Sequence, residues 1–351
     1  MVRKYLTENP SREIDSIISQ LDPDKVLIVT DFNVKREVLP KLSQSKVINN
    51  SNLISLKSGE EGKNVDSVID LWRKLEEIGA TRSSVVINIG GGVITDIGGF
   101  AAATFKRGIR TVNFPTTLLG AVDAATGGKT GIDFMGLKNE IGAFHMPSKV
   151  IISTLPFSTL PKEEILSGYA EMVKTALISD KNFYIRLLEM DKVLTHTNIL
   201  GESVEKCVVT KDEVVKEDPQ EKGLRKILNF GHTAGHAFES LRIDQNKPVT
   251  HGKAVAHGML VALILSHFIF GLDSTEVHYY VSFLKNHYGG SLIDCRGINE
   301  VISKMNSDKK NRKHGEPTFT LLKEIGVPEI NITPTRKELD KTLEMYLDLM
   351  G

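Results

Sequence analysis

The segment that decides the fold is Ser84–Asp96, with the sequence SVVINIGGGVITD. Ser84–Ile89 is the β-branched run of a buried strand, and it leads directly into three glycines. Val93–Asp96 then opens an apparent helix. A glycine turn between a strand and a helix lets the backbone approach a pyrophosphate, and the helix N-terminus offers free N–H groups. A tight turn without a ligand has the same pattern, so the turn alone leaves both interpretations open.

Strand and helix patterns alternate on both sides of this segment. Lys25–Thr30 predicts a buried strand that ends at Asp31, and Thr111–Phe114 predicts a short strand that ends at Pro115. Between them, Val65–Ile78 carries apolar residues at helical spacing. This alternation predicts a Rossmann-like α/β domain, in which helices cover both faces of a parallel sheet. The polar residues that follow these strands lie where such sheets bind ligands, which favours a nucleotide site: Asp31, Asn33, Thr116 and Thr117.

The second half of the chain is dominated by helical patterns. Ser153–Pro161 contains two prolines and two serines between periodic regions. A domain boundary is therefore expected there, with an α/β domain at 1–156 and a mostly helical domain at 157–351. No strand-like alternation of comparable clarity occurs in the second domain. Its helical patterns are Glu163–Ile178, Ile199–Val215, His232–Leu241 and Gly252–Phe270.

Length and composition restrict the class of protein. A chain of 351 residues is longer than a single hydrophobic core usually supports, so two domains are expected. Its 40% apolar and 25% charged residues are typical of a soluble globular protein. Lys+Arg and Asp+Glu both number 44, which argues against nucleic acid or an anionic membrane as partner but allows a small anionic substrate. The two cysteines, Cys207 and Cys295, are too few for a disulfide framework. We therefore expect a cytoplasmic protein with no signal peptide or membrane span.

A glutamate and three histidines in the second half form a candidate metal site. One Glu and two His that leave a position open are a common way to hold catalytic zinc. Glu171 shares a helix face with Lys174, and His232 shares one with His236, while His251 follows later. The pair His232 and His236 is the simplest choice, but spacing does not decide which two histidines bind metal. Hydrogen-bonded core histidines are the alternative interpretation.

Several cations accompany this candidate site. Taken one at a time, each of these cations, such as Lys211 or Arg225, is best interpreted as a solvated surface charge. Gly127–Thr130, GGKT, invites comparison with a phosphate loop, but it lacks the preceding glycine that such a loop requires. We interpret the basic run Lys309–Lys313 as a loop that closes on an anionic ligand.

Six short motifs, taken in order, resemble the 3-dehydroquinate synthase family of sugar phosphate cyclases. The likeness extends from about Val26 to Leu322, and although each motif is short, the ordered set is highly specific. The motifs are Gly90–Asp96, Pro115–Asp123, Gly127–Gly131, Lys138–Phe144, Leu228–Ala237 and His251-Gly252.

The resemblance implies an enzyme of aromatic amino acid biosynthesis (the shikimate pathway). Such an enzyme converts 3-deoxy-D-arabino-heptulosonate 7-phosphate to 3-dehydroquinate and phosphate, using NAD and a zinc or cobalt ion. The α/β domain at 1–156 would bind NAD, and the helical domain at 157–351 would bind metal and substrate. The active site would lie in a cleft between them. The protein would be a homodimer in which Arg107 reaches the neighbouring subunit's site.

The resemblance also implies a role for each matching residue. It assigns the metal to Glu171, His232 and His251, which replaces the choice based on spacing and leaves His236 to the substrate. NAD would be bound by Asp31, Asn33, Glu60, Lys63, Gly91, Gly92, Val93, Asp96, Thr116, Thr117, Lys138 and Thr159. The substrate would be bound by Asp123, Lys129, Asn139, Lys174, Lys211, Arg225, Asn229, His236 and Lys309.

Three departures from the family pattern fall outside these positions. Lys253 replaces a frequent acidic residue, Asp133 a frequent asparagine, and Thr126 a frequent small apolar residue. Three other interpretations compete with the family's own reaction. A cyclase that makes a valiolone or an inosose would lack some carboxylate-binding residues, a metal-dependent glycerol or alcohol dehydrogenase would produce NADH, and a non-catalytic NAD-binding protein would not need the metal ligands.

Overall fold

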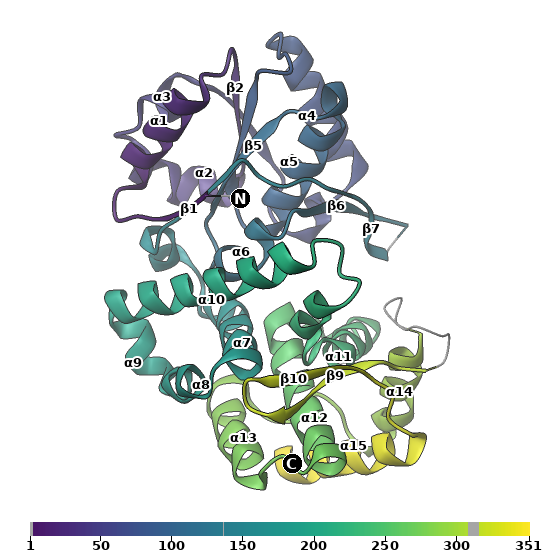
Figure 1. Cartoon of the computed structure of the whole chain (residues 1–351). Coiled ribbons are helices and arrows are strands. Elements are labelled where there is room, and N and C mark those ends of the chain that lie inside the picture. The colour runs from purple at the N-terminus through teal and green to yellow at the C-terminus, as the bar shows by residue number, and fades with distance from the viewer. Residues whose placement is uncertain (1–2, 136, 308–315) are drawn as a thin grey trace. The chain divides into compact units, whose positions relative to one another are not determined.

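The computed structural model describes residues 3–135, 137–307 and 316–351 (Figure 1). The chain divides into two compact units. Unit 1 comprises Met1–Pro161 with Leu200–Val208, and unit 2 comprises Lys162–Ile199 with Val209–Gly351.

Unit 1 is built on a six-stranded parallel sheet with the strand order β1-β8-β5-β4-β2-β3. The parallel sheet that the sequence predicts is therefore confirmed. From β2 the chain passes to β3 on one side and then to β4 on the other. This reversal creates a topological switch point between β2 and β4, where ligands of open α/β sheets bind. The strands are β1 (Arg3–Leu6), β2 (Val26–Asp31), β3 (Asn52–Leu56), β4 (Val85–Gly90), β5 (Arg110–Pro115) and β8 (Lys149–Ile152).

Helices cover both faces of this sheet, and every residue of the central strand β4 is buried as a result. Residues of α4 and α5, such as Leu71 and Ile97, pack in one apolar cluster with side chains from one face of the sheet. Residues of α1, such as Ile14 and Ile17, pack in a second cluster with side chains from the other face. The α-helices are α1 (Pro10–Leu21), α2 (Phe32–Glu37), α3 (Lys46–Asn50), α4 (Val65–Glu77), α5 (Gly92–Thr104) and α6 (Leu118–Val122). Short 3-10 helices are η1 (Leu39–Leu42), η2 (Glu60–Gly62), η3 (Phe105–Arg107), η4 (Ala124–Thr126) and η5 (Leu155–Thr159).

Unit 1 also contains an antiparallel hairpin, β6 (Lys129–Phe134) and β7 (Leu137–Phe144), which the sequence patterns did not predict. Most of β7 is exposed, so no buried face imposes the alternation that identifies a strand. The hairpin exposes large apolar side chains, with 44% of Phe134, 58% of Leu137 and 65% of Phe144 accessible to solvent.

Unit 2 is mostly helical, as the sequence predicts. Helix α12 is apolar on all sides because most of it is buried among other helices. Its length and mean hydropathy of 1.7 would also fit a membrane span, but 72% of the apolar window is buried inside the structure, as in a core helix. The α-helices are α7 (Lys162–Ser179), α8 (Lys181–Leu188), α9 (Met190–Thr195), α11 (His232–Asp244), α12 (His251–Phe270), α13 (Ser274–Tyr288), α14 (Ile298–Asn306) and α15 (Arg336–Met350). Helix α10 (Thr197–Glu217) is divided between the units, because Leu200–Val208 belongs to unit 1 and the rest of the helix to unit 2. The 3-10 helices are η6 (Leu224–Asn229) and η7 (Cys295–Gly297).

A second hairpin, β9 (Phe319–Glu324) and β10 (Val327–Ile332), corrects the expectation that the second half lacks clear strands. Four consecutive residues of β9 are buried, and an apolar run of this length does not by itself distinguish a strand from part of a helix. In Figure 1 the hairpin lies beside the helices of unit 2, and the hydroxyl of Ser266 on α12 accepts a hydrogen bond from the backbone of Leu322 at 2.9 Å.

Candidate active site

In unit 1, residues predicted to bind NAD gather at the carboxyl edge of the sheet. Asp31 ends β2 at the switch point, and its Oδ1 accepts hydrogen bonds from the backbone of Asn33 at 2.8 Å and of Val34 at 3.0 Å. The same oxygen accepts one from the hydroxyl of Ser58 at 3.0 Å. Asp31 therefore caps the N-terminus of α2 and joins it to the segment after β3.

The glycine turn lies at the end of β4, next to the end of β5. Gly91 precedes α5 and provides no side-chain cap, so the first N–H groups of that helix face the carboxyl edge. The backbone of Thr116 donates a hydrogen bond to the carbonyl of Gly90 at 3.0 Å. A β carbon on Gly91 would lie only 3.0 Å from Cγ2 of Thr117, so a larger residue would displace that side chain. The turn thus has the geometry that an anion at a helix N-terminus requires.

A buried lysine connects the glycine helix to the β6–β7 hairpin. Lys63 is 4% exposed, and its Nζ lies 2.6 Å from Oδ2 of Asp96 and 2.5 Å from Oδ1 of Asn139. Its carbonyl accepts a hydrogen bond from the backbone of Asp133 at 2.9 Å, and Oδ1 of Asp133 accepts one from the backbone of Asn139 at 2.8 Å. Burial raises the pKa of Asp96 to about 6, although Lys63 opposes that shift. Asp133, which in the sequence is only a departure from the family pattern, thus holds the backbone of Asn139 near the start of β7.

The other residues predicted for unit 1 are more dispersed. Arg107 is exposed and has a left-handed backbone, with φ of 66°. Lys129 begins β6 and is exposed. The remaining residues predicted for unit 1 are Glu60 in η2, Gly92 and Val93 in α5, Asp123 after α6, Lys138 in β7 and Thr159 in η5.

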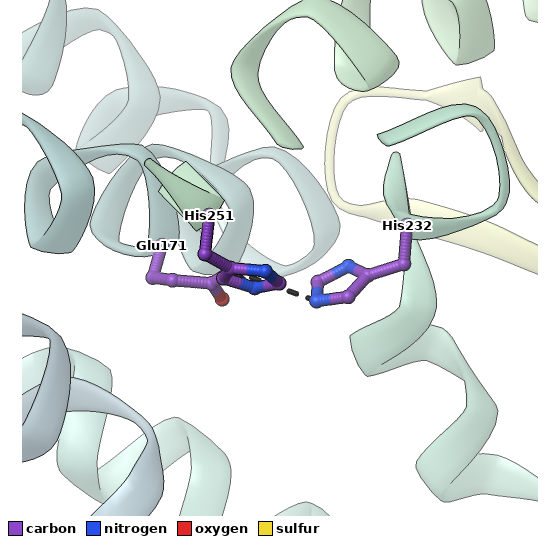
Figure 2. Close-up of side chains that lie close together, drawn as sticks. All are labelled: Glu171, His232 and His251. Atoms are coloured by element: carbon purple, nitrogen blue, oxygen red, sulfur yellow. Dashed lines mark ion pairs between the residues drawn. The ribbon is translucent and has the colours of Figure 1, made fainter. Parts of the chain in front are cut away.

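In unit 2, Glu171, His232 and His251 converge from three helices. They lie on α7, α11 and α12, and one potential ligand atom from each falls within 4.8 Å of the other two. Figure 2 shows the three side chains pointing toward one another. Nε2 of His232 and Nε2 of His251 each lie 3.6 Å from Oε1 of Glu171, which is too far for a hydrogen bond.

These separations suit a metal ion better than direct contacts. Tetrahedral zinc at about 2.0–2.2 Å from each ligand holds the ligand atoms roughly 3.3–3.6 Å apart. That spacing is close to the 3.6 Å between Oε1 of Glu171 and each histidine Nε2. The donor set, one carboxylate and two imidazoles, is also one that zinc and cobalt accept. The three side chains therefore fit a divalent ion with a coordination position left for a ligand.

The far nitrogen of each imidazole has an acceptor that favours metal binding. Nδ1 of His232 lies 3.2 Å from the carbonyl of Phe230, and Nδ1 of His251 lies 3.3 Å from Oε2 of Glu239. A proton on Nδ1 can be donated to these oxygens, which leaves the lone pair on Nε2 directed at the convergence point.

A buried ion pair fixes the charge of Glu171. Both Glu171 and Lys174 have side chains only 2% exposed, and Nζ of Lys174 contacts Oε2 of Glu171. Burial alone would raise the pKa of Glu171, but Lys174 and His251 outweigh it and lower that pKa to about 2. Burial would lower the pKa of His251, but Glu171 and Glu239 raise it to about 9. Glu171 is therefore a carboxylate at neutral pH.

Gly252 explains how His251 comes so close to Glu171. A β carbon at Gly252 would lie 2.1 Å from the backbone oxygen of Ser167, one helical turn before Glu171. The backbone N–H of Gly252 also donates a hydrogen bond to Oγ of Ser167 at 3.1 Å, which joins the two helices at this point. The close approach of α12 to α7 thus depends on the absence of a side chain.

The burial of Lys211 and Arg225 corrects the interpretation that each is a solvated surface charge. Lys174, Lys211 and Arg225 are 2%, 7% and 3% exposed. Burying a cation is costly unless it is paired or binds an anion. The guanidinium of Arg225 donates to the carbonyl of Pro219 at 2.8 Å, and the amide of Asn229 donates to Oε1 of Glu221 at 2.6 Å. Lys309 lies outside the described residues.

His236 lies beside the three converging residues without being one of them. Its ring centroid is 5.4 Å from that of His232 and 6.0 Å from that of His251. The sequence reasoning did not identify Glu239 or Glu221 as contacts of site residues. Glu239 follows His232 by seven residues, so the pattern His-x3-His-x2-Glu on one face of α11 was the available signal.

Comparison with known proteins agrees with this arrangement. The family model described as 3-dehydroquinate synthase N-terminal matches residues 53–167, and the one described as 3-dehydroquinate synthase C-terminal matches residues 168–311. A 3-dehydroquinate synthase of Parabacteroides distasonis is 42% identical over 97% of this chain and 96% of its own length. One from Thermococcus kodakarensis is 37% identical over 96% of this chain and 94% of its own length.

Solved structures share the fold at lower identity. A 2-epi-5-epi-valiolone synthase from Streptomyces hygroscopicus with bound NAD+ and Zn2+ aligns with a TM-score of 0.86 and 23% identity, over 99% of this chain and 97% of that one. A 2-deoxy-scyllo-inosose synthase with carbaglucose-6-phosphate, NAD+ and Co2+ aligns with a TM-score of 0.82 and 21% identity, over 98% and 96%. At such identities these likenesses establish the fold alone. Since the two family models and the relatives cover most of its length, the chain belongs to the 3-dehydroquinate synthase family.

Proposed function

We propose that this protein is a cytoplasmic 3-dehydroquinate synthase. It converts 3-deoxy-D-arabino-heptulosonate 7-phosphate to 3-dehydroquinate and phosphate by transient oxidation, phosphate elimination, re-reduction and aldol cyclisation. The observation that carries the proposal is the convergence of Glu171, His232 and His251 in a unit that also buries several cations. The names of the relatives support the same reaction.

We assign two cofactors to this reaction. Bound NAD would accept a hydride from a secondary alcohol and return it later, while a zinc or cobalt ion would lower the pKa of that hydroxyl as a Lewis acid. The ends of β2, β4 and β5 would hold NAD, with Asp31, Gly91 and Thr117 among its contacts. Glu171, His232 and His251 would hold the metal. The NAD+ with Zn2+ or Co2+ in the two solved cyclases supports this assignment.

The buried cations of unit 2 give the substrate its binding determinants. A sugar acid phosphate carries a carboxylate and a phosphate, and both need charged donors fixed in position. Arg225 suits a carboxylate through its planar fork, while Lys174 and Lys211 act as point charges. His236, next to the proposed metal ligands, is within reach of a substrate hydroxyl bound there. Catalysis would depend mainly on positioning and electrostatics.

Redox balance separates this reaction from that of a related dehydrogenase. With metal, NAD and the heptulosonate phosphate, NADH absorbance is expected to stay near a level set by the enzyme concentration while many turnovers occur. The hydride returns in each cycle, so NAD is required but not consumed. Accumulation of NADH in proportion to product would instead identify a glycerol or alcohol dehydrogenase.

We further propose that the enzyme is a homodimer in which Arg107 enters the partner subunit's substrate site. Two observations support this. Arg107 is exposed on unit 1, and the β6–β7 hairpin of the same unit exposes Phe134, Leu137 and Phe144. Exposed apolar side chains gathered on one hairpin are typical of a protein–protein interface. Most soluble oligomers are built from identical chains, so a second copy of this chain is the expected partner.

Mixing two inactive variants tests the role of Arg107. Arg107→Ala is expected to retain the fold and NAD binding but to lose substrate affinity, because a charge-assisted contact of about 1.5–3 kcal/mol disappears. Lys129→Ala removes a residue assigned to the same site from the other chain. A mixed dimer has one site with both defects and one with neither, so activity is expected to return. If mixed dimers form without any recovery, Arg107 does not act across the interface.

A further inference from the structure

Glu239 on α11 contacts a proposed metal ligand from the side opposite the metal. It is 9% exposed, and its Oε2 lies 3.3 Å from Nδ1 of His251. The other ring nitrogen of His251, Nε2, lies 3.6 Å from Oε1 of Glu171. The imidazole is therefore held between two carboxylates, one directed at each nitrogen.

This placement determines which nitrogen carries the proton. A neutral imidazole has one N–H and one lone pair, and an acceptor at Nδ1 keeps the proton there. The lone pair is then on Nε2, the atom that converges with Glu171 and His232. The carbonyl of Phe230 has the same relation to Nδ1 of His232, at 3.2 Å. When a metal takes the place of the Nε2 proton, the remaining proton of each histidine therefore lies on Nδ1, opposite Oε2 of Glu239 or the carbonyl of Phe230.

One face of α11 carries both a proposed metal ligand, His232, and the carboxylate of Glu239, which contacts a second proposed ligand, His251. His232 and Glu239 are seven residues apart, which is two helical turns, so they project from the same side of the helix. His251 begins α12, and its imidazole lies between the carboxylates of Glu239 and Glu171. A rigid helix therefore sets the distance between the two imidazoles.

We propose that Glu239 is a positioning residue that fixes the orientation and the Nδ1–H tautomer of His251 for a divalent metal. The inference depends on the metal site of the proposed function. The competing interpretation is that Glu239 forms only a structural ion pair with a protonated His251. In that case its removal changes the stability of the metal-free protein and leaves zinc affinity unchanged.

Zinc affinity, measured by competition with a chromophoric chelator, distinguishes the two. Glu239→Ala is expected to weaken zinc binding by about 10–100-fold, as loss of an outer-shell partner does. Glu239→Gln is expected to fall between the wild type and Glu239→Ala, because its amide oxygen still accepts the Nδ1 proton but carries no charge. Asp244→Asn is the matched control on the same helix, where Asp244 pairs with Lys304, and its affinity is expected to equal that of the wild type.

Further readouts separate failure of this inference from failure of the metal site. If the wild type binds no zinc, the proposed metal site is wrong. If the wild type binds zinc and both Glu239 variants bind it equally well, the positioning role is overturned. If Glu239→Ala does not fold, Glu239→Gln decides by the same comparison. With cobalt in place of zinc, the visible absorption of the folded Glu239 variants is expected to change while that of Asp244→Asn does not.

Discussion

His251→Ala is expected to lose the bound zinc that His236→Ala retains. Nε2 of His251 is one of the three atoms that converge within 4.8 Å, whereas His236 lies beside that group. Removal of a direct ligand should weaken zinc binding by more than the about 10–100-fold typical of an outer-shell change. Metal analysis after dialysis against a weak chelator measures the difference.

The two histidine variants serve as each other's control. Both remove one imidazole from the same region of unit 2, so a general loss of folding would affect both. His236→Ala is expected to contain one zinc per chain and to be impaired in turnover of the substrate. Retention of zinc by His251→Ala together with its loss from His236→Ala would show that the ligands are the pair favoured by sequence spacing.

Lys174→Met is expected to destabilise the metal-free protein by about 3–5 kcal/mol, because it leaves the buried carboxylate of Glu171 without its ion-pair partner. Saturating zinc is expected to restore part of this loss, since the metal supplies a positive charge at the same carboxylate and binds the folded state. Urea denaturation with chelator and with zinc measures both effects.

Lys192→Met provides the matched control for this variant. Lys192 also follows its glutamate partner, Glu189, by three residues, but the two side chains are 63% and 60% exposed. Its loss is expected to cost less than about 1 kcal/mol, with no dependence on zinc. Equal losses for the two methionine variants would contradict the account of a buried, charge-dependent site.

The parallel sheet could be predicted because its strands are buried runs with clear ends. SVVINI became β4, Val85–Gly90, and the pattern ended by Pro115 became β5. The helical spacing of Val65–Ile78 likewise became α4. The two hairpins escaped prediction for opposite reasons. Most of β7 is exposed, whereas four consecutive residues of β9 are buried, and neither case produces regular alternation.

The candidate site could be predicted only in part because its geometry depends on contacts between distant segments. Spacing places His232 and His236 on one helix face, and only the resemblance selected His251. In the structure His251 joins Glu171 and His232 because Gly252 allows α12 to approach α7. The burial of Lys174, Lys211 and Arg225, and the contact of Glu239 with His251, likewise depend on packing that no local pattern encodes.

Phosphate release from 3-deoxy-D-arabino-heptulosonate 7-phosphate tests the proposed function most directly. The zinc-loaded protein is expected to release one phosphate per substrate and many per NAD, and to stop when either NAD or metal is removed. A sugar phosphate that lacks the carboxylate is expected to be a poor substrate, because Arg225 and the buried lysines would have no carboxylate to bind. Efficient phosphate release from that compound, with none from the heptulosonate phosphate, would contradict the account and identify a different sugar phosphate cyclase.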